Sequence, residues 1–400
     1  MLRPGTFALT ALLAGLSAVG PLSTDMYLPS MPDIANDLQA STAQVGLTIS
    51  SYLIGFAAGQ ILYGPVSDRH GRKPVLLGAL VLYCVASMAC ALSTSIHLLI
   101  ICRALQALGG SGAIVIARAV VRDLYSGARA GRELSVMGSV MALAPVLAPM
   151  AGGLLQTGFG WRSIFVVLVV ASVAGMLIVW RLLPETLPAR AAQPVTIGAM
   201  LRSYKFVAGN GGYRAYLALA SASYAGLFAW ISGASFVLQN LYGLTAASFG
   251  FFFAIGSVGY LAGTSVAAKF VGRYGLDTTI GFGSAALALG GFGVVAAVAL
   301  GFTGALPIVL SVAVFLAGLG MVLPQSIAGA LTPFPERAGA ASSLFGFVQQ
   351  STAAVCGALV GWLLGESAWP LAGGMAVMGC ATALLWLSSR RVRRIAGKAG

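Results

Sequence analysis

Asp25 is the acidic residue of a long apolar segment that extends over residues 7–28. A carboxylate inside the hydrocarbon core of a membrane costs about 2.5 to 3.5 kcal/mol, so acids in such segments usually face a water-filled cavity and lie on a proton or substrate path. We therefore expect Asp25 to bind and release protons. The alternative is a structural acid at the wet end of the first helix.

Arg103 is a second charge inside an apolar segment, three residues before Gln106. If the helices that carry Asp25 and Arg103 cross a membrane in opposite directions, both residues lie about 8 to 9 Å below the same boundary. A nearby arginine favours an ionised carboxylate, whereas loss of water disfavours it. A change in their separation or hydration would then exchange a proton. The alternative is an arginine that only ties the two helices together.

The short connection over residues 64–73 combines glycines, an acid and several bases. Its length predicts a tight turn, for which Gly64 and Gly71 supply the conformational freedom. Asp68 is expected to meet the positive N-terminal end of a neighbouring helix. Contacts of this kind would form in one conformation and break in another, so the connection is predicted to act as a gate.

The arginines of this connection have candidate partners on the adjacent helix ends. Arg69 or Arg72 can pair with Asp123 or Glu133. A connection that is basic only to orient the chain would explain Arg72 and Lys73, but not the embedded acid and the glycines. The residues predicted to gate are Gly64, Asp68, Arg69, Gly71, Arg72 and Asp123.

Two prolines and two glycines follow one another in residues 145–153. Pro145 and Pro149 remove backbone donors and are expected to bend their helix, while Gly152 and Gly153 allow another helix to approach closely. The pattern predicts a bent, tightly packed seam. A structural bend without a role in transport is the alternative, because Pro and Gly are common in membrane helices.

The elements that position these residues are predicted to be membrane helices. The 400 residues are 58% hydrophobic and 8% charged, against about 25% charged in soluble domains. A span needs about 20 apolar residues, so we predict an all-α membrane protein with twelve transmembrane helices. The predicted spans are residues 7–31, 42–65, 74–92, 98–121, 134–157, 163–183, 213–238, 246–271, 278–303, 306–331, 339–364 and 369–389.

An internal repeat divides the chain into two similar halves. Residues 67–72 (SDRHGR) return in eroded form as residues 271–276 (VGRYGL), and Trp161 and Trp369 occupy corresponding places. We expect two six-helix bundles, residues 1–185 and 213–400, joined by a cytoplasmic linker, residues 186–212. Transporters built from such halves bind substrate near the middle of the membrane.

The distribution of charge predicts orientation. Most of the 23 Lys and Arg residues lie in the even-numbered connections or at the termini, so both termini are expected in the cytoplasm. The net charge of +13 is then a topology signal and not a sign of nucleic-acid binding. The five cysteines fall inside apolar spans and are expected to be neither disulfides nor metal ligands.

These segments together resemble the major facilitator superfamily along nearly the whole chain. Within it they are similar to drug:proton antiporters of the bicyclomycin-resistance and chloramphenicol-efflux type, the Bcr/CflA family. Residues 24–32 are similar to the first-helix signature, 64–73 to the loop motif, 103–106 to the fourth-helix arginine motif, 145–153 to the antiporter motif and 184–186 to the end of span six.

The resemblance implies a proton-coupled exporter of small amphipathic drugs in a bacterial cytoplasmic (inner) membrane, working as a monomer. Asp25 would be the protonation site and would face the drug cavity. No cofactor or metal is expected, and since no phosphate-binding loop occurs, the energy source would be the proton gradient. The chain lacks the second acid that some relatives carry earlier in span one, and the second loop motif has Gly272 where an acid is expected.

Polar and aromatic residues of the spans are candidates for the wall of the drug cavity, since adaptable apolar surfaces tolerate many shapes. Each is alternatively a packed or lipid-facing side chain. The candidates are Tyr27, Tyr52, Gln60, Gln106, Tyr224, Phe228, Trp230, Phe236 and Gln349. The rival functions are a proton-coupled importer of a small metabolite with the same fold and, from another class, a membrane-embedded enzyme or receptor.

Overall fold

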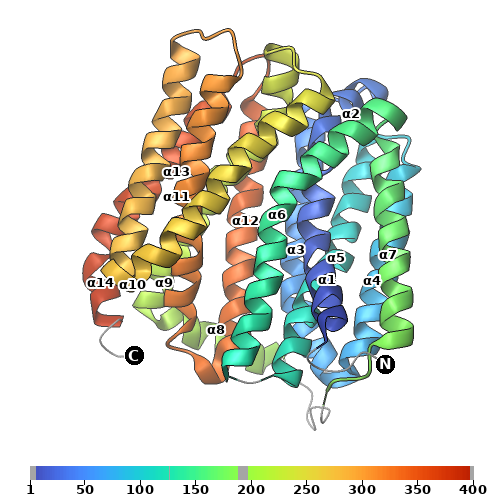
Figure 1. Ribbon diagram of the computed structural model, residues 1–400, viewed down its shortest axis with the longest axis vertical. Coiled ribbons are helices and arrows are strands. Elements are labelled where there is room, and N and C mark those ends of the chain that lie inside the picture. The colour runs from blue at the N-terminus through green and yellow to red at the C-terminus, as the bar shows by residue number, and fades with distance from the viewer. Residues whose placement is uncertain (1–5, 126, 188–196, 397–400) are drawn as a thin grey trace. The chain divides into compact units, whose positions relative to one another are not determined.

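The computed structural model describes residues 6–125, 127–187 and 197–396, and in these ranges the chain forms helices and no strand (Figure 1). The first half contains α1 (Phe7–Asp25), η1 (Leu28–Ser30), α2 (Met31–Asp37), α3 (Thr42–His70), α4 (Arg72–Ala91), α5 (Ile96–Leu124), α6 (Gly127–Phe159) and α7 (Arg162–Leu182).

The second half begins with a short helix and continues with long ones. Its elements are α8 (Ile197–Gly209), α9 (Gly211–Phe236), the π-helical η2 (Val237–Leu241), α10 (Ala246–Ala299), α11 (Leu306–Leu331), η3 (Pro335–Arg337), α12 (Ala338–Leu363), α13 (Trp369–Ser388) and α14 (Arg390–Ala396).

Eleven helices of the described ranges are long and apolar enough to cross a membrane. One of them, α10, has 54 residues and contains the non-helical Gly275, with φ 78° and ψ 171°. This break lies between the predicted spans 246–271 and 278–303, so α10 supplies two spans. The predicted fold class, an all-α membrane protein with twelve transmembrane helices, is confirmed.

The predicted loop at residues 64–73 is wrong in its local structure. The segment 64–73 is not a loop, because α3 continues through His70 and α4 starts at Arg72. Gly71 alone makes the turn, with φ 101°, whereas Gly64 lies inside α3. Within the predicted linker 186–212, residues 197–209 form α8, and residues 188–196 lie outside the described ranges.

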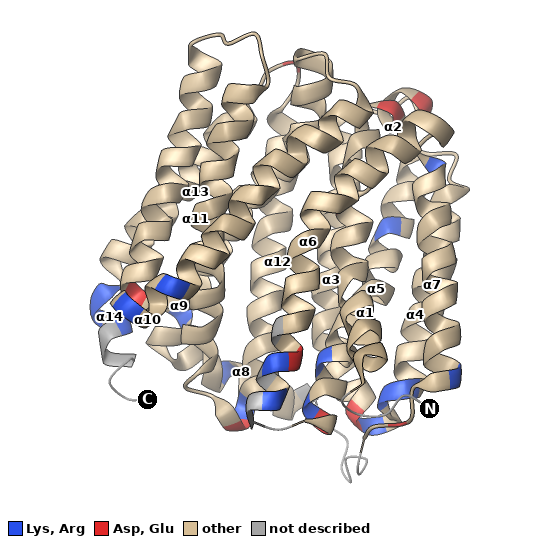
Figure 2. Cartoon of the chain, in the orientation of Figure 1, with Lys and Arg blue, Asp and Glu red and all other residues tan. Residues whose placement is uncertain are grey.

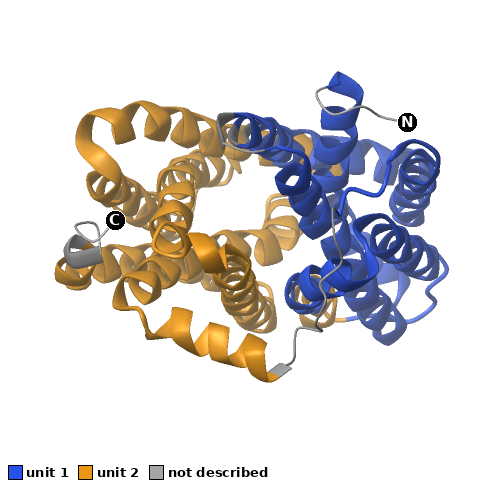
Figure 3. Ribbon diagram, turned by 90° about the horizontal axis from the view of Figure 1, so that it is seen from below, with its two compact units in different colours: residues 1–40, 51–195 blue, residues 41–50, 196–400 orange. Residues whose placement is uncertain are grey.

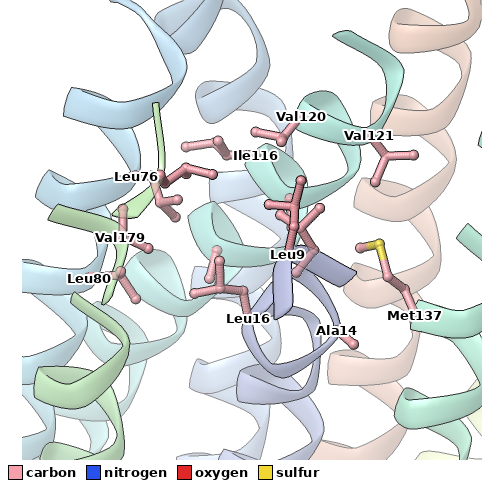
Figure 4. Close-up of a cluster of buried hydrophobic side chains, with 14 of the residues drawn as sticks. Leu9, Ala14, Leu16, Leu76, Leu80, Ile116, Val120, Val121, Met137 and Val179 are labelled. Carbon is pink, nitrogen blue, oxygen red and sulfur yellow. The ribbon is translucent and has the colours of Figure 1, made fainter. Parts of the chain in front are cut away.

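The chain divides into two compact units, residues 1–40 with 51–195 and residues 41–50 with 196–400 (Figure 3). The first unit has a buried core of aliphatic side chains from five helices (Figure 4). Its members include Leu9 and Leu16 of α1, Leu76 and Leu80 of α4, Ile116 and Val120 of α5, Met137 of α6 and Val179 of α7.

Small residues let helices of the second unit approach closely. Gly259 and Gly263 lie four residues apart on α10, and a Cβ atom on either would overlap the backbone carbonyl of Ala313 or Ala317 on α11. Without a side chain, the two backbones pack directly against each other, as is common where lipid supplies no hydrophobic driving force.

Charged residues are concentrated at the helix ends. In each unit taken by itself, most Lys and Arg residues lie toward one end of the helices (Figure 2). Apolar side chains and small hydroxyl residues occupy the middle of the helices in each unit. A buried charge there is therefore exceptional.

Candidate functional site

Asp25 is the last residue of α1 and is buried, with 5% of its surface exposed. The hydroxyl of Thr24 donates a 2.9 Å hydrogen bond to its Oδ1. Four ion pairs occur among the described residues, and they join Arg72 to Asp68 and Asp123, Arg162 to Asp37, and Arg393 to Asp277. Asp25 belongs to none of them.

Arg103 on α5 is fully buried and is held by neutral groups. Its Nη1 donates to the backbone oxygen of Ser23 at 3.0 Å and to Oε1 of Gln106 at 2.7 Å. The guanidinium carbon lies 4.3 Å from the ring centre of Tyr52 and 4.7 Å from that of Tyr27. Cation–π contacts of this kind are strongest away from water, so Arg103 ties α5 to the end of α1.

The guanidinium of Arg103 retains donors for a further partner. Among the described residues its Nε and Nη2 have no hydrogen-bond acceptor, although buried donors are almost always paired. Arg103 and Asp25 therefore lie near the same point of α1 without forming an ion pair in this conformation.

A chain of hydroxyl and amide groups surrounds this arginine. Gln106 donates from Nε2 to the hydroxyl of Ser87 at 2.8 Å, and the hydroxyls of Ser23 and Tyr83 lie 2.6 Å apart. Ser23, Tyr83 and Ser87 were not recognised from the sequence as site residues. Serines in apolar helices often bond only to their own backbone, so the sequence carried no signal that would have singled them out.

The predicted antiporter motif packs directly against the Asp25 segment. A Cβ atom on Gly152 would overlap the backbone oxygen of Met26, the residue that follows Asp25. Pro145 and Pro149 lie inside α6, and Gly153 is buried beside Gly152. The hydroxyl of Ser30 also donates to Oε1 of Gln156 on the same helix, at 2.7 Å.

Four residues of the first unit were predicted to line a drug cavity, and their surroundings are not all alike. Tyr27, Tyr52 and Gln106 are 0–2% exposed and turn toward Arg103. Gln60 on α3 is half-buried. Three of the four candidates thus contact the buried arginine, and the sequence did not predict this grouping.

The second-unit candidates lie along α9 and α12. Tyr224 is half-buried with its ring centre 5.1 Å from that of Phe228, while Trp230 is fully buried and stacks on Phe253 at 5.9 Å. The last two candidates are Phe236, 4% exposed at the end of α9, and the half-buried Gln349 of α12.

Arg72 is the centre of the predicted gate. Its Nε donates to Oδ2 of Asp123 at 2.8 Å, and its Nη1 lies 2.5 Å from Oδ1 of Asp68 and 2.7 Å from the Ser67 hydroxyl. Arg69 is exposed. The expected pairing of an arginine with Asp123 is therefore found, and Arg72 is the arginine that makes it.

Glu185 occupies the place predicted for Asp68 at a helix N-terminus. Its carboxylate accepts the backbone N–H groups of Arg72 at 2.9 Å and Lys73 at 3.2 Å, which begin α4, and those of Thr186 and Leu187 at 3.0 Å each. Partial burial acts to raise the pKa of Glu185, but these four donors outweigh it and the pKa is lowered. The sequence showed Glu185 only as the end of span six.

Glu133, the other predicted partner of the arginines, is used differently. Its Oε2 accepts the hydroxyl of Thr10 on α1 at 2.6 Å, so it ties α6 to α1.

The second unit contains a related ion pair next to its own glycine turn. Two residues after Gly275, Oδ1 of Asp277 lies 2.7 Å from Nε of Arg393 on α14. Nη2 of Arg393 also donates to the backbone oxygen of Trp386 at 2.7 Å, and the Trp386 indole donates to the backbone oxygen of Asp277 at 3.0 Å. Sequence comparison of the two loops did not predict this pair.

The sequence profile of the Major Facilitator Superfamily matches residues 13–357. The chain belongs to this superfamily. The chain is therefore a membrane transporter and not an enzyme. A bicyclomycin resistance protein homolog from Haemophilus influenzae is 30% identical, with 98% of each chain covered.

Two further comparisons agree with this assignment. A chloramphenicol resistance protein from Pseudomonas aeruginosa is 31% identical, covering 98% of this chain and 92% of the relative. The crystal structure of a D-xylose-proton symporter has the same fold, with a TM-score of 0.74 and 17% identity over 96% of this chain and 97% of the symporter. The resemblance to bicyclomycin-resistance and chloramphenicol-efflux transporters is confirmed.

Proposed function

We propose that this superfamily member is a proton-coupled exporter of small amphipathic antibiotics in a bacterial cytoplasmic membrane. The names of the two full-length relatives support drug resistance as its role. The observation that carries proton coupling is the buried Asp25, which belongs to none of the ion pairs of the described residues. Arg103, which has unused donors, binds the backbone oxygen of Ser23, two residues before Asp25.

Asp25 would carry the proton. A carboxyl group that loses its proton in a buried site becomes charged there, which is unfavourable. A conformation in which water or a cation reaches that charge then has the lower free energy and becomes more populated. Nε and Nη2 of Arg103 are suitable partners in such a state. Gain of a proton removes the charge and the need for the partner, which links protonation to the position of the α1 end.

The gradient supplies the energy. One proton that moves inward contributes about 2.3 kcal/mol per 100 mV of membrane potential, with any pH difference added. Drug would bind from the cytoplasmic side as Asp25 gives up its proton, and would leave on the other side as Asp25 regains one. The Arg72 network would hold one of the two conformations.

The test is Asp25→Asn in proteoliposomes, with chloramphenicol as the drug and a pH-sensitive dye inside the vesicles. Asparagine keeps the size and the acceptor for Thr24 but has no group that ionises near neutral pH, so we expect drug-induced proton movement to fall by at least tenfold. Asp37→Asn is the matched control, because this acid is exposed and paired with Arg162. Proton-coupled transport at the normal rate in Asp25→Asn would disprove the assignment.

A further inference from the structure

α8 is too short to cross a bilayer, yet it lies directly beside a membrane span. Asn210 alone separates it from α9, and Oδ1 of Asn210 accepts the N–H of Tyr213 in the first turn of α9 at 2.9 Å. The span that starts there has 31 residues, about 46 Å of helix, which equals a bilayer with its headgroups. A helix next to the start of such a span is expected at the level of the headgroups.

One face of α8 packs against its own unit. Val207 is fully buried, and the hydroxyl of Tyr204 lies 3.2 Å from that of Ser343 on α12. Phe206 lies at the border of this face, since its ring makes an edge contact with Phe334, with centres 6.2 Å apart, while the residue stays 58% exposed. These contacts fix which face of the helix points away from the protein.

The opposite face combines large apolar side chains with cations. Leu201 is 60% exposed and Phe206 is 58% exposed. Arg202 and Lys205 are also exposed, and at 100° per residue they lie between the two apolar side chains on the helix surface. At a membrane surface, exposed apolar side chains can enter the acyl boundary while neighbouring cations meet the headgroups.

A third cation comes from the start of span eleven. The guanidinium carbon of Arg337 lies 4.1 Å from the ring centre of Phe206. Glu336 is the neighbouring acid and is exposed. Arg202, Lys205 and Arg337 together outnumber it, so this surface carries a net positive charge.

We propose that this surface of α8 binds the phosphate headgroup of an anionic phospholipid. The three cations would contact the phosphodiester while Leu201 and Phe206 enter the acyl region beneath it. Each basic residue near a membrane surface contributes about 1 kcal/mol toward anionic lipid. Free phosphate is also an anion, but it gains nothing from the apolar side chains. The inference does not depend on the substrate or on proton coupling.

The test measures lipid binding to the purified full-length protein by native mass spectrometry and by thermal shift. The probes are short-chain phosphatidylglycerol, phosphatidylcholine and inorganic phosphate. The variant is Arg202→Gln with Lys205→Gln, and the matched control is Lys269→Gln with Arg273→Gln, an exposed basic pair of α10. Lys205→Gln alone is included in case the double variant is unstable.

We expect the protein to prefer phosphatidylglycerol over phosphatidylcholine, and each cation lost from α8 to weaken phosphatidylglycerol binding about fivefold. Leu201→Asn should weaken lipid binding without changing the effect of phosphate. The proposal fails if the α8 variants keep the preference, if the α10 control loses as much, or if inorganic phosphate displaces phosphatidylglycerol at equal concentration.

Discussion

Gly152 is the residue through which α6 reaches the segment that carries Asp25. Replacing it with alanine puts a methyl group into the backbone oxygen of Met26, so α6 must move away from the end of α1. Overpacking of this kind costs about 1 to 3 kcal/mol. We expect Gly152→Ala to lower the melting temperature and to slow drug export, as measured by thermal shift and by vesicle transport.

Gly158 provides the matched comparison on the same helix. A Cβ atom there has no neighbour within 4 Å, and alanine is favoured over glycine in a helix by up to about 1 kcal/mol. Gly158→Ala should therefore leave stability equal or slightly higher. Equal losses in the two variants would show that the close approach to Met26 is not the cause.

Single charges in apolar segments could be recognised from sequence, but their partners could not. Asp25 and Arg103 were both identified because a charge in hydrocarbon is costly. The acceptor that ties Arg103 to α1 is the backbone oxygen of Ser23, and every residue has such an oxygen. Tyr27 and Tyr52 were predicted as candidates for the wall of the drug cavity, and the sequence did not show that both rings face Arg103.

At the scale of elements, Glu185 connects the end of span six to the start of α4. Since its pKa is below the ordinary value of 4.5, the carboxylate stabilises the fold above pH 4.5, and this contribution is lost as the pH falls through the lowered pKa.

Glu185→Gln removes the charge and keeps an acceptor. We expect its melting temperature to be lower than that of the unchanged protein at pH 7, and the difference to shrink as the pH is lowered below 4.5. Thermal shift across a pH series checks this. A difference that stays constant into acid would mean that the charge of Glu185 is not what holds α4.

Apolar segments of the sequence predicted that membrane helices exist, but they did not predict where each helix begins and ends. The sequence indicated a loop at 64–73 because of its glycines and charges, but the ion pair of Arg72 with Asp123 and the cap by Glu185 come from tertiary contacts. α8 was not predicted because its 13 residues are fewer than the about 20 that a membrane span needs, and the helices were predicted as spans.

At the scale of the whole molecule, the basic residues predict that both termini are cytoplasmic. We expect Cys at position 391, after the last span, to be protected from a membrane-impermeant thiol reagent in intact cells, and Cys at position 366, between α12 and α13, to react. Both native residues, Arg391 and Glu366, are exposed. The assay uses Arg391→Cys and Glu366→Cys in a background where the five native cysteines are replaced.

Cell lysis before labelling is the control, and it should make both positions react. Labelling of position 391 in intact cells would reverse the predicted orientation. Transport direction would then have to be assigned again, because the proposed export of drug assumes that the Arg72 network faces the cytoplasm.

The attachment of α14 through Arg393 has a practical consequence for work with this transporter. Shortening the chain at Ser389 would leave the carboxylate of Asp277 and the backbone oxygen of Trp386 without the guanidinium that binds both. An affinity tag or fluorescent reporter is therefore better joined downstream of Ala396 than to the last membrane helix itself, so that purification handles and activity assays report on the intact second bundle.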